Sequence, residues 1–534
     1  MITKFDQNTL YPWDGKPSIY EYIVSALDDR GRLADDTLPD DDEYWAGHSV
    51  HWVAGGMDGT FSEPVEGQAD TAKVQELMQL LVKQSRRPGN KKRRATYLKL
   101  MQEDVLSVIN LLLLESLREH PGVVIPNLYQ EAEWFARHGA HRNVVKLGIA
   151  LLGQFETEKH RELVVTLGKH VEFTLYSAVA IQGSLNNANE TLFELAKVVD
   201  GRGKIQLVER LEPQTQEIRD WLLRHGCSNR IMHEHPACYC ARNGGLAEAL
   251  SQASVDRELY DGAGVILSAL LAGEDAMEDI DDYEDAASAV GDFLRHSQTM
   301  CVTAVQLSVV TDIYDFLSED GQRWERRYGR GWSDDLREAC KRLCENVIHD
   351  EGWPSKIEEA IRSQDSAVRQ HAIYAAYRLR MDIWEELFGQ LQKHPLDSLL
   401  YVQLAQTDEP ERMDRLVRYA EAHLPLDEIA SGPQDEIGYG EQYEPHQCLQ
   451  SLLRALDVFE GRGTKLVAAG LRSPATMNRN MALRCLEAWP LPVWGEEVTG
   501  ALQELVASEP NEQIKERIAK LLQEKELTAW LIKL

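Results

Sequence analysis

Residues 361–376 read IRSQDSAVRQHAIYAA, and residues 471–486 read LRSPATMNRNMALRCL. Both stretches carry an Arg-Ser pair, then an arginine, then an alanine at matching positions: Arg362-Ser363, Arg369 and Ala372 recur as Arg472-Ser473, Arg479 and Ala482. The arginines Arg369 and Arg479 are 110 positions apart (479 − 369), a distance that holds three units of roughly 37 residues, somewhat under the length of HEAT and armadillo repeats. The pattern therefore predicts stacked pairs of helices.

Further matches extend this weak repeat in both directions. Lys515 follows Arg479 by 36 positions (515 − 479), and an earlier copy begins at Val145-Lys146. These segments resemble HEAT-type repeats, in which a basic residue opens the inner helix and small residues let paired helices approach. The alternative is that unrelated amphipathic helix pairs produce the same matches.

The helical pattern follows an N-terminal part of different composition. Residues 1–70 are rich in Asp, Gly, Pro and aromatic residues, and residues 48–54 are compatible with a short hairpin or with a loop. From Thr71 onward the apolar residues recur with helical spacing. We therefore predict an all-α fold, a HEAT-like α-solenoid of stacked helix pairs with a short irregular N-terminal cap. The predicted parts are the cap (1–70), a helical-repeat array (71–355) and C-terminal HEAT-like repeats (356–534).

Charge and cysteine content exclude several classes of partner. The chain has 534 residues and a formal charge of −30 at pH 7, so we expect no nucleic-acid partner and no affinity for anionic membranes. The longest apolar run, residues 105–114, is about half of the ~20 residues that a membrane span needs. Eight scattered cysteines and an N-terminus without a secretory pattern predict reduced thiols and a cytoplasmic location.

Side chains that bind transition metals are concentrated in one short segment: His225, Cys227, His233, Glu234, His235, Cys238 and Cys240. Thiolate and imidazole ligands together suit zinc or iron. We take His233, His235, Cys238 and Cys240 as a candidate metal site. Because their spacing matches no standard zinc module, the competing interpretation is buried thiols beside histidines in a turn between helices.

Other clusters have simpler interpretations. Cys340 and Cys344 share a face of a predicted helix and are expected to be small buried hydrophobic residues. The basic residues of segment 86–94 either hold a phosphate or an acidic partner, or pair with the protein's own carboxylates. The Gly-rich loop at 431–445 and the acidic run at 274–285 interrupt the helical texture, and neither predicts a function.

The usual cofactor motifs are missing from the sequence. Gly461-Arg462-Gly463 and Gly262-Ala263-Gly264 are only fragments of a dinucleotide-binding loop, because neither has the third glycine at the required place. We find no haem or flavin motif. The catalytic and cofactor-binding residues are therefore unknown from sequence.

Residues 9–22, TLYPWDGKPSIYEY, resemble the N-terminal region of limonene hydroxylase-like proteins of bacilli, and the resemblance extends along the chain. It implies a monooxygenase that converts limonene, a small apolar terpene, to carveol or perillyl alcohol. It also implies NAD(P)-dependent alcohol dehydrogenase activity toward carvone or perillyl aldehyde. An apolar groove between helices, lined by aromatic residues such as Trp134, Phe135 and Phe155, would accept such a substrate.

Two functions follow from these observations. The resemblance implies limonene hydroxylation, an oxidoreductase activity for which no catalytic residue is assigned. The residues themselves favour a non-catalytic HEAT-like helical-repeat scaffold whose helical face binds another protein.

Overall fold

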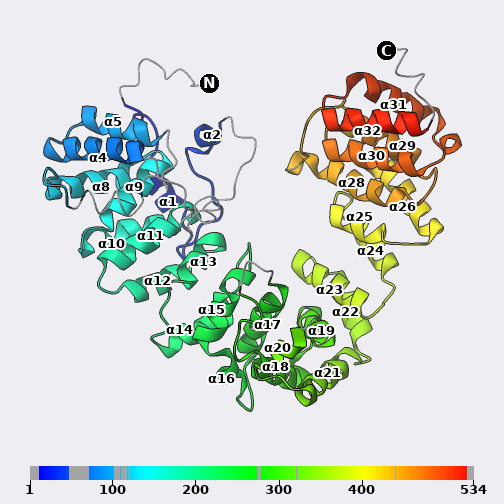
Figure 1. Ribbon diagram of the computed structural model, residues 1–534, viewed down its shortest axis with the longest axis horizontal. Helices are drawn as coiled ribbons and strands as arrows, with labels where there is room; N and C mark the ends of the chain where they lie inside the picture. Colours follow the sequence, from blue (N-terminus) through cyan, green and yellow to red (C-terminus); the bar gives the residue numbers. More distant parts are fainter. Residues whose placement is uncertain are drawn as a thin grey trace. The chain divides into compact units, whose positions relative to one another are not determined.

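The computed structural model describes residues 11–46, 71–101, 109, 117, 119–273, 278–319, 321, 323–438 and 440–525. In these ranges every regular element is a helix, and extended pairing is limited to two isolated bridges, Leu27 with Leu33 and Glu436 with Ala475. The predicted all-α class is therefore confirmed for the described residues (Figure 1). The possible hairpin at residues 48–54 lies outside the described residues.

The chain divides into two compact units. The first unit comprises Met1–Val302 and Gln306–His349, and the second comprises Thr303–Val305 and Asp350–Leu534. The separate cap predicted for residues 1–70 and the predicted boundary at residue 355 stay predictions of the sequence.

The first unit contains most of the helices. Their bounds are α1 (Ile19–Ala26), α2 (Asp41–Tyr44), α4 (Thr71–Arg86), α5 (Asn90–Leu100), α8 (Ile125–His138), α9 (Arg142–Leu152), α10 (Arg161–Gly168), α11 (Val171–Ser184), α12 (Ala188–Ala196), α13 (Gly201–Val208), α14 (Gln216–Trp221), α15 (Glu234–Gly244), α16 (Leu246–Leu250), α17 (Arg257–Ala272), α18 (Ala286–Met300), most of α19 (Ala304–Ser318), α20 (Arg323–Arg327) and α21 (Asp334–Ile348).

The second unit contains the remaining described helices. These are α22 (Trp353–Ile361), α23 (Ser366–Arg378), α24 (Trp384–Leu391), α25 (Ser398–Leu404), α26 (Pro410–His423), α27 (Leu426–Ile429), α28 (Glu444–Leu456), α29 (Thr464–Leu471), α30 (Thr476–Ala488), α31 (Gly495–Ser508) and α32 (Glu512–Glu524). Among the helices that the structure describes, none has both the length and the apolar character of a membrane span.

Helices of the first unit pack in two rows. α9, α11, α13, α15 and α17 contact one another in chain order, and α8, α10 and α12 do the same beside them. Consecutive helices also pack as the pairs α8–α9, α10–α11 and α12–α13, which Figure 1 shows in the cyan to green part of the ribbon. Each amphipathic helix thereby buries its apolar stripe against its partner and against the next pair.

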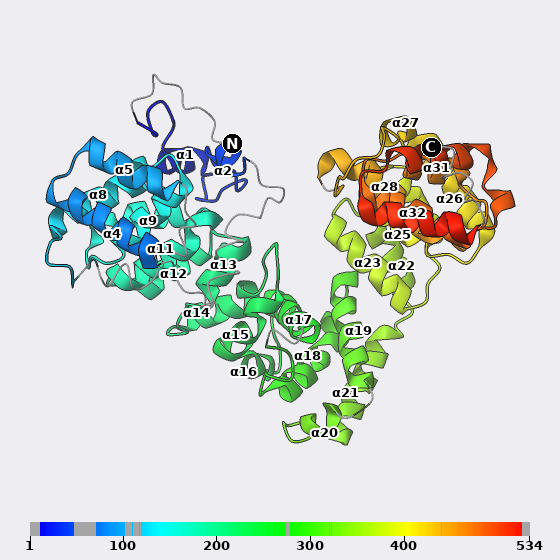
Figure 2. The ribbon, with the colours of Figure 1, turned by 45° about the horizontal axis from the view of Figure 1, so that its top comes forward.

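The second unit repeats this kind of packing. α25, α28, α30 and α32 contact one another in chain order, and α29 contacts both α30 and α31 (Figure 1). Figure 2 shows α25, α28 and α32 of this row in a second view. Leu449, Leu452 and Leu453 of α28 are fully buried, as are Ala482 and Leu486 of α30. The core of this unit therefore lies between successive helices and not around one central element.

Local sequence features explain where these helices begin and how closely they pack. Asp365 and Asp397 begin α23 and α25, because each carboxylate accepts hydrogen bonds from two backbone N–H groups of the first turn. Gly148 lets α9 approach α8, since a Cβ at this position would lie 2.5 Å from the backbone nitrogen of Ala136.

Arg369 and Arg479, the two arginines of the predicted repeat, make matching contacts. Arg369 lies near the start of α23, donates a hydrogen bond to the carbonyl of the serine six positions earlier (3.1 Å) and pairs with Asp397 (3.5 Å). Arg479 lies near the start of α30, donates to the serine carbonyl six positions earlier (2.8 Å) and pairs with Glu509 (2.7 Å). In both cases the carboxylate comes from just before the second helix of the next pair.

Candidate functional site

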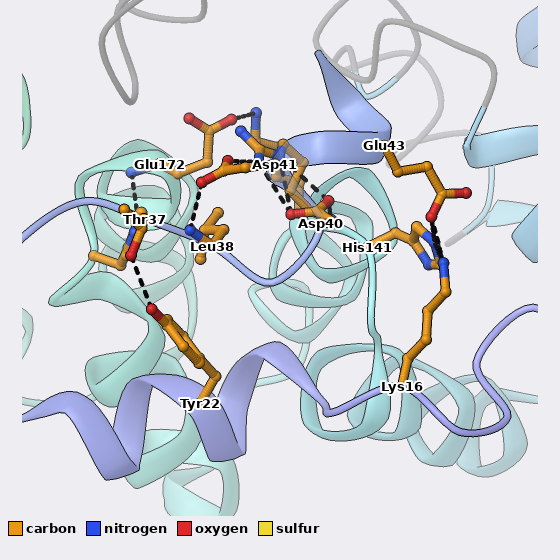
Figure 3. Close-up of polar contacts among 12 residues, drawn as sticks. Lys16, Tyr22, Thr37, Leu38, Asp40, Asp41, Glu43, His141 and Glu172 are labelled. Carbon is orange, nitrogen blue, oxygen red and sulfur yellow. Dashed lines mark hydrogen bonds and ion pairs between the residues drawn. The ribbon is translucent and has the colours of Figure 1, made fainter. Parts of the chain in front are cut away.

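Segment 11–46 is attached to α9 by a buried ion pair. Asp40 accepts hydrogen bonds from the backbone nitrogen of Arg142 (2.8 Å) and from its Nη2 (3.0 Å), and Asp41 pairs with the same guanidinium. The side chains of Asp40 and Arg142 are each 3% exposed. Figure 3 shows the carboxylates of Asp40 and Asp41 converging at this point. Charge-assisted bonds of this kind are strong because water does not compete for them.

A second group of contacts joins the same segment to His141. Lys16 pairs with Glu43, and the Nε2 atom of His141 lies 3.0 Å from Lys16 Nζ and 3.2 Å from Glu43 Oε2 (Figure 3). The Nδ1 atom of His141 lies 2.8 Å from the hydroxyl of Tyr97 in α5. Burial lowers the pKa of His141 and raises the pKa of Tyr97. At neutral pH the imidazole is therefore uncharged and the phenol is protonated.

These groups are acids and bases, but each of them faces another protein group. Lys146 of α9 pairs with Glu172 of α11 at 2.6 Å, and both side chains are buried. The hydroxyls of Thr37 and Tyr22 lie 2.8 Å apart. The polar cluster in Figure 3 therefore fastens segment 11–46 to the start of α9, and Lys146 joins α9 to α11. We find no chemistry for it beyond this structural role.

The predicted metal ligands lie at the start of α15. The Nε2 atom of His233 is 2.8 Å from the carbonyl oxygen of Asn229, and His235 is half-buried. Cys238 and Cys240 are buried two positions apart on the helix, so their side chains leave it in different directions. Within the described ranges, no three His, Cys, Asp or Glu side chains gather closely enough to hold a metal ion. The structure does not bring the four residues together, and the metal site stays a prediction.

Burial explains the state of the cysteines. All eight are buried, and none of them forms a disulfide. Loss of hydration raises the pKa of Cys238 to about 12 and that of Cys227 to about 12, so both are protonated thiols at neutral pH. Cys340 and Cys344 of α21 are buried as well, and burial raises the pKa of both. Their surroundings suit small hydrophobic residues.

The basic residues of segment 86–94 contact the protein itself. Arg86 Nε donates a hydrogen bond to the carbonyl of Gly122 (2.7 Å), and Arg93 forms two hydrogen bonds with Glu131 (2.8 Å each). The Arg93 guanidinium also lies 4.0 Å from the ring of Trp134. These contacts favour the interpretation in which the basic side chains pair with the protein's own groups.

Of the three aromatic residues predicted to line an apolar groove, only Phe155 borders a described pocket. This pocket, of about 600 Å³, lies beside α8 and includes Leu128, Tyr129 and Leu151. We call it the apolar pocket. The hydroxyl oxygen of Tyr129 is buried and has no hydrogen-bond partner among the described residues. Phe135 is instead fully buried in the core.

A second pocket, of about 520 Å³, forms a groove on the row of α25, α28 and α30. Its large apolar side chains are unusually exposed: Leu399 is 55%, Ile437 59% and Met477 41% exposed. Neighbouring exposed apolar residues commonly mark a binding surface. We call this surface the α25–α30 groove. Its residues are Ser398, Leu399, Val402, Ala405, Gln406, Ile437, Gly438, Gln447, Gln450, Ser451, Arg454, Ala455 and Met477.

The loop between α27 and α28 forms one wall of this groove. The backbone nitrogen of Thr476 donates to the carbonyl of Glu436 (2.9 Å), which ties the loop to the start of α30. Gln447 Nε2 of α28 donates to the carbonyl of Gly438 (3.3 Å). Ile437 lies between these two attachments, and they hold its side chain at the groove although its backbone is irregular.

The polar lining of the α25–α30 groove contains amides and a cation but no carboxylate. Gln406 and Gln450 carry amide groups that both donate and accept hydrogen bonds. Arg454 of α28 is exposed, and no ion pair joins it to another described residue. In a chain with a charge of −30, a carboxylate-free surface with an arginine favours a ligand that carries a carboxylate.

Sequence reasoning found neither the polar cluster at Arg142 nor the α25–α30 groove. The groove is lined by residues of α25, α28 and α30 and by Ile437 and Gly438 of the loop before α28. These segments are far apart in the chain. The only signal in the sequence was the Gly-rich interruption at residues 431–445. No protein-family model and no curated protein matches the chain.

Proposed function

We propose that this protein is a HEAT-like helical-repeat scaffold that binds an extended segment of a partner protein in the α25–α30 groove. The observation that carries the proposal is the groove itself, with its exposed apolar residues and its lack of carboxylates. The rows of helices in chain order and the matching contacts of Arg369 and Arg479 support an α-solenoid. The absence of disulfides among the eight described cysteines supports a cytoplasmic location, where thiols stay reduced.

The chemistry of the groove selects the kind of segment that it binds. Leu399, Ile437 and Met477 match an apolar side chain, which loses contact with water on binding. The amides of Gln406 and Gln450 match a peptide backbone, because an extended peptide has an unpaired N–H and C=O at each residue. Arg454 matches a carboxylate. The proposed ligand is therefore an extended peptide with an acidic residue close to an apolar one.

Selection from a displayed library of random peptides against the purified full-length chain tests this proposal. We expect enrichment of peptides that combine apolar and acidic residues. In a fluorescence polarisation assay with an enriched peptide, Leu399→Asp and Arg454→Glu should each weaken binding about tenfold or more.

Val458 supplies a matched control, because it is 76% exposed in the same unit but does not line the groove. Val458→Asp should leave the affinity for the peptide unchanged. The proposal fails if no peptide is enriched, or if Val458→Asp weakens binding as much as Leu399→Asp does.

The apolar pocket favours limonene hydroxylation as a second candidate function. The resemblance implies conversion of limonene to carveol or perillyl alcohol, followed by NAD(P)-dependent dehydrogenation. A volume of about 600 Å³ lined by Leu128, Leu151 and Phe155 is large enough for a ten-carbon terpene. The unpaired hydroxyl of Tyr129 would donate a hydrogen bond to the oxygen of the alcohol product.

Gas chromatography of the purified protein incubated with limonene and a reduced nicotinamide cofactor tests this second candidate. Carveol or perillyl alcohol should accumulate above a boiled control, and Tyr129→Phe should lower the affinity for the alcohol. If neither alcohol forms, the scaffold function alone stands. The candidate metal site is tested on the same preparation, since Cys238→Ser with Cys240→Ser should release any bound metal.

A further inference from the structure

A polar pocket of about 870 Å³ lies in the first unit, between segment 11–46 and the starts of α11 and α13. Residues 32–36 line one side of it. Trp221, at the end of α14, lines another. We call it the basic pocket. It shares no residue with the apolar pocket or with the α25–α30 groove.

The two carboxylates in the basic pocket are already committed to other groups. Asp36 pairs with Arg230. Asp200 accepts hydrogen bonds from the backbone nitrogens of Gly201 (2.6 Å) and Arg230 (3.2 Å), and thereby begins α13. Neither carboxylate forms an ion pair with a lysine of the pocket within the described part of the chain.

The positive charges outnumber these carboxylates. Five basic side chains line the pocket: Arg32, Lys169, Lys197, Lys204 and Arg230. Arg230 is matched by Asp36, and Lys197 pairs with two glutamates outside the pocket. No ion pair joins Arg32, Lys169 or Lys204 to another described residue. Three of the five cations therefore form no salt bridge in the described part of a chain whose formal charge is −30.

Among the described residues of the basic pocket, Lys204 contacts only uncharged groups. Its Nζ atom donates to the carbonyl oxygen of Ser228 (2.6 Å) and lies 5.4 Å from the centre of the Trp221 ring. Both partners are uncharged. Loss of hydration lowers the pKa of Lys204, and the charge of Asp200 offsets this effect only in part. A bound anion would relieve this cost.

We propose that the basic pocket binds a small molecule that carries two or more phosphate groups. Lys169, Lys204 and Arg32 contact the phosphates, since lysine and arginine bind phosphate through charge-assisted hydrogen bonds. The volume exceeds that of the phosphates alone, and the Trp221 ring is a flat face for an organic group. A long polyanion is disfavoured because the rest of the chain repels it.

Isothermal titration calorimetry on the purified full-length chain tests this proposal, with sodium pyrophosphate and metal-free ATP as probes at low salt. We expect saturable binding of both probes, and tighter binding of ATP if its base contacts Trp221. Lys169→Met and Lys204→Met should each weaken pyrophosphate binding about tenfold. Arg32→Gln should weaken it as well, and this exposed residue can be changed without disturbing the core.

Lys197 is the matched control, because it lines the same pocket but is already neutralised by its two glutamates. Lys197→Met should change the affinity by less than about threefold. The proposal is overturned if neither probe binds saturably, or if Lys197→Met weakens binding as much as Lys204→Met. Sulfate that binds wild type, Lys169→Met and Lys204→Met equally well, with pyrophosphate no tighter, would show an adventitious ion only.

Discussion

Arg479 illustrates how a single side chain supports the second unit. Its guanidinium forms two hydrogen bonds with Glu509 (2.7 and 2.8 Å) and two with the carbonyls of Ser473 and Pro474. Both charged side chains are fully buried. Removal of the arginine would leave the carboxylate of Glu509 buried without a cation, which is far more costly than loss of a surface ion pair.

We expect Arg479→Met to lower the free energy of unfolding of the second unit by about 3–5 kcal/mol. Arg369→Met is the matched control, because Arg369 is 12% exposed and its ion pair with Asp397 is longer, at 3.5 Å. Loss of this ion pair should lower the free energy of unfolding by about 1 kcal/mol or less. Hydrogen exchange of the second unit in increasing urea measures both values. Equal losses in the two variants would contradict this account.

His170 is a buried residue whose charge state matters for α11. Its Nδ1 atom accepts a hydrogen bond from the backbone nitrogen of Glu172 (3.2 Å), and this requires an unprotonated Nδ1. Burial lowers the pKa of His170 below 6.5. The unfolded chain therefore takes up this proton at a higher pH than the folded chain does. The contribution to stability is complete above about pH 6.5 and is lost as the pH falls below it.

We expect the wild-type protein to lose stability between about pH 7.5 and pH 5, and His170→Asn to lose less. Asparagine keeps a side-chain oxygen that can begin α11, but it does not titrate. Urea unfolding at the two pH values measures the difference. The same slope in wild type and His170→Asn would refute the role of this histidine.

At the level of helices, the packing of α8 on α9 depends on Gly148. A Cβ there would lie 2.5 Å from the nitrogen of Ala136 and 3.0 Å from the carbonyl oxygen of Ala132. Both are backbone atoms of α8, so they move only if the whole helix moves. Gly389 in α24 is the opposite case, because no atom lies within 4 Å of the position of its Cβ.

Alanine at these two glycines should therefore have opposite effects. Gly148→Ala should destabilise the first unit by about 1–3 kcal/mol, since α9 must move away from α8. Gly389→Ala should stabilise the second unit by about 0.5–1 kcal/mol, since alanine favours the helix and meets no obstacle. Thermal unfolding of the two variants beside wild type measures the changes. Stabilisation by both substitutions would show that helix propensity, and not the contact, dominates.

For the molecule as a whole, the charge of −30 sets the electrostatic background. The chain has 87 Asp and Glu residues but only 57 Lys and Arg residues. The carboxylates repel one another, and this repulsion opposes the compact state. Against this background, Arg454 and three basic residues of the basic pocket are exceptional, because they form no ion pair with a described carboxylate.

Added salt should stabilise the protein because it screens this repulsion. We expect the melting temperature to rise by a few degrees between about 0.02 and 0.3 M sodium chloride. Circular dichroism melts at several salt concentrations measure the change, with sucrose at matched osmolality as the uncharged control. A fall in melting temperature would mean that surface ion pairs contribute more than the repulsion does.

Some of the fold and little of the candidate site could be predicted. Periodic apolar residues predicted the helices, and the match of Arg369 with Arg479 predicted a basic residue near the start of a helix at both positions. The metal-site prediction relied on the short spacing of Cys238 and Cys240. That argument needed extended backbone, whereas the structure has a helix there. Proximity in sequence did not bring those ligands together.

By itself, the sequence determined that the described part of the chain is helical and that Arg369 and Arg479 lie near the starts of helices. Helix propensity and amphipathic spacing act over a few turns, so they can be read from neighbouring residues. Only the tertiary structure decided that Leu399, Ile437 and Met477 share one exposed surface, and that residues 32–36 complete a pocket with α11 and α13. Exposure and charge compensation depend on which distant segments packing brings together, and no local pattern contains that information.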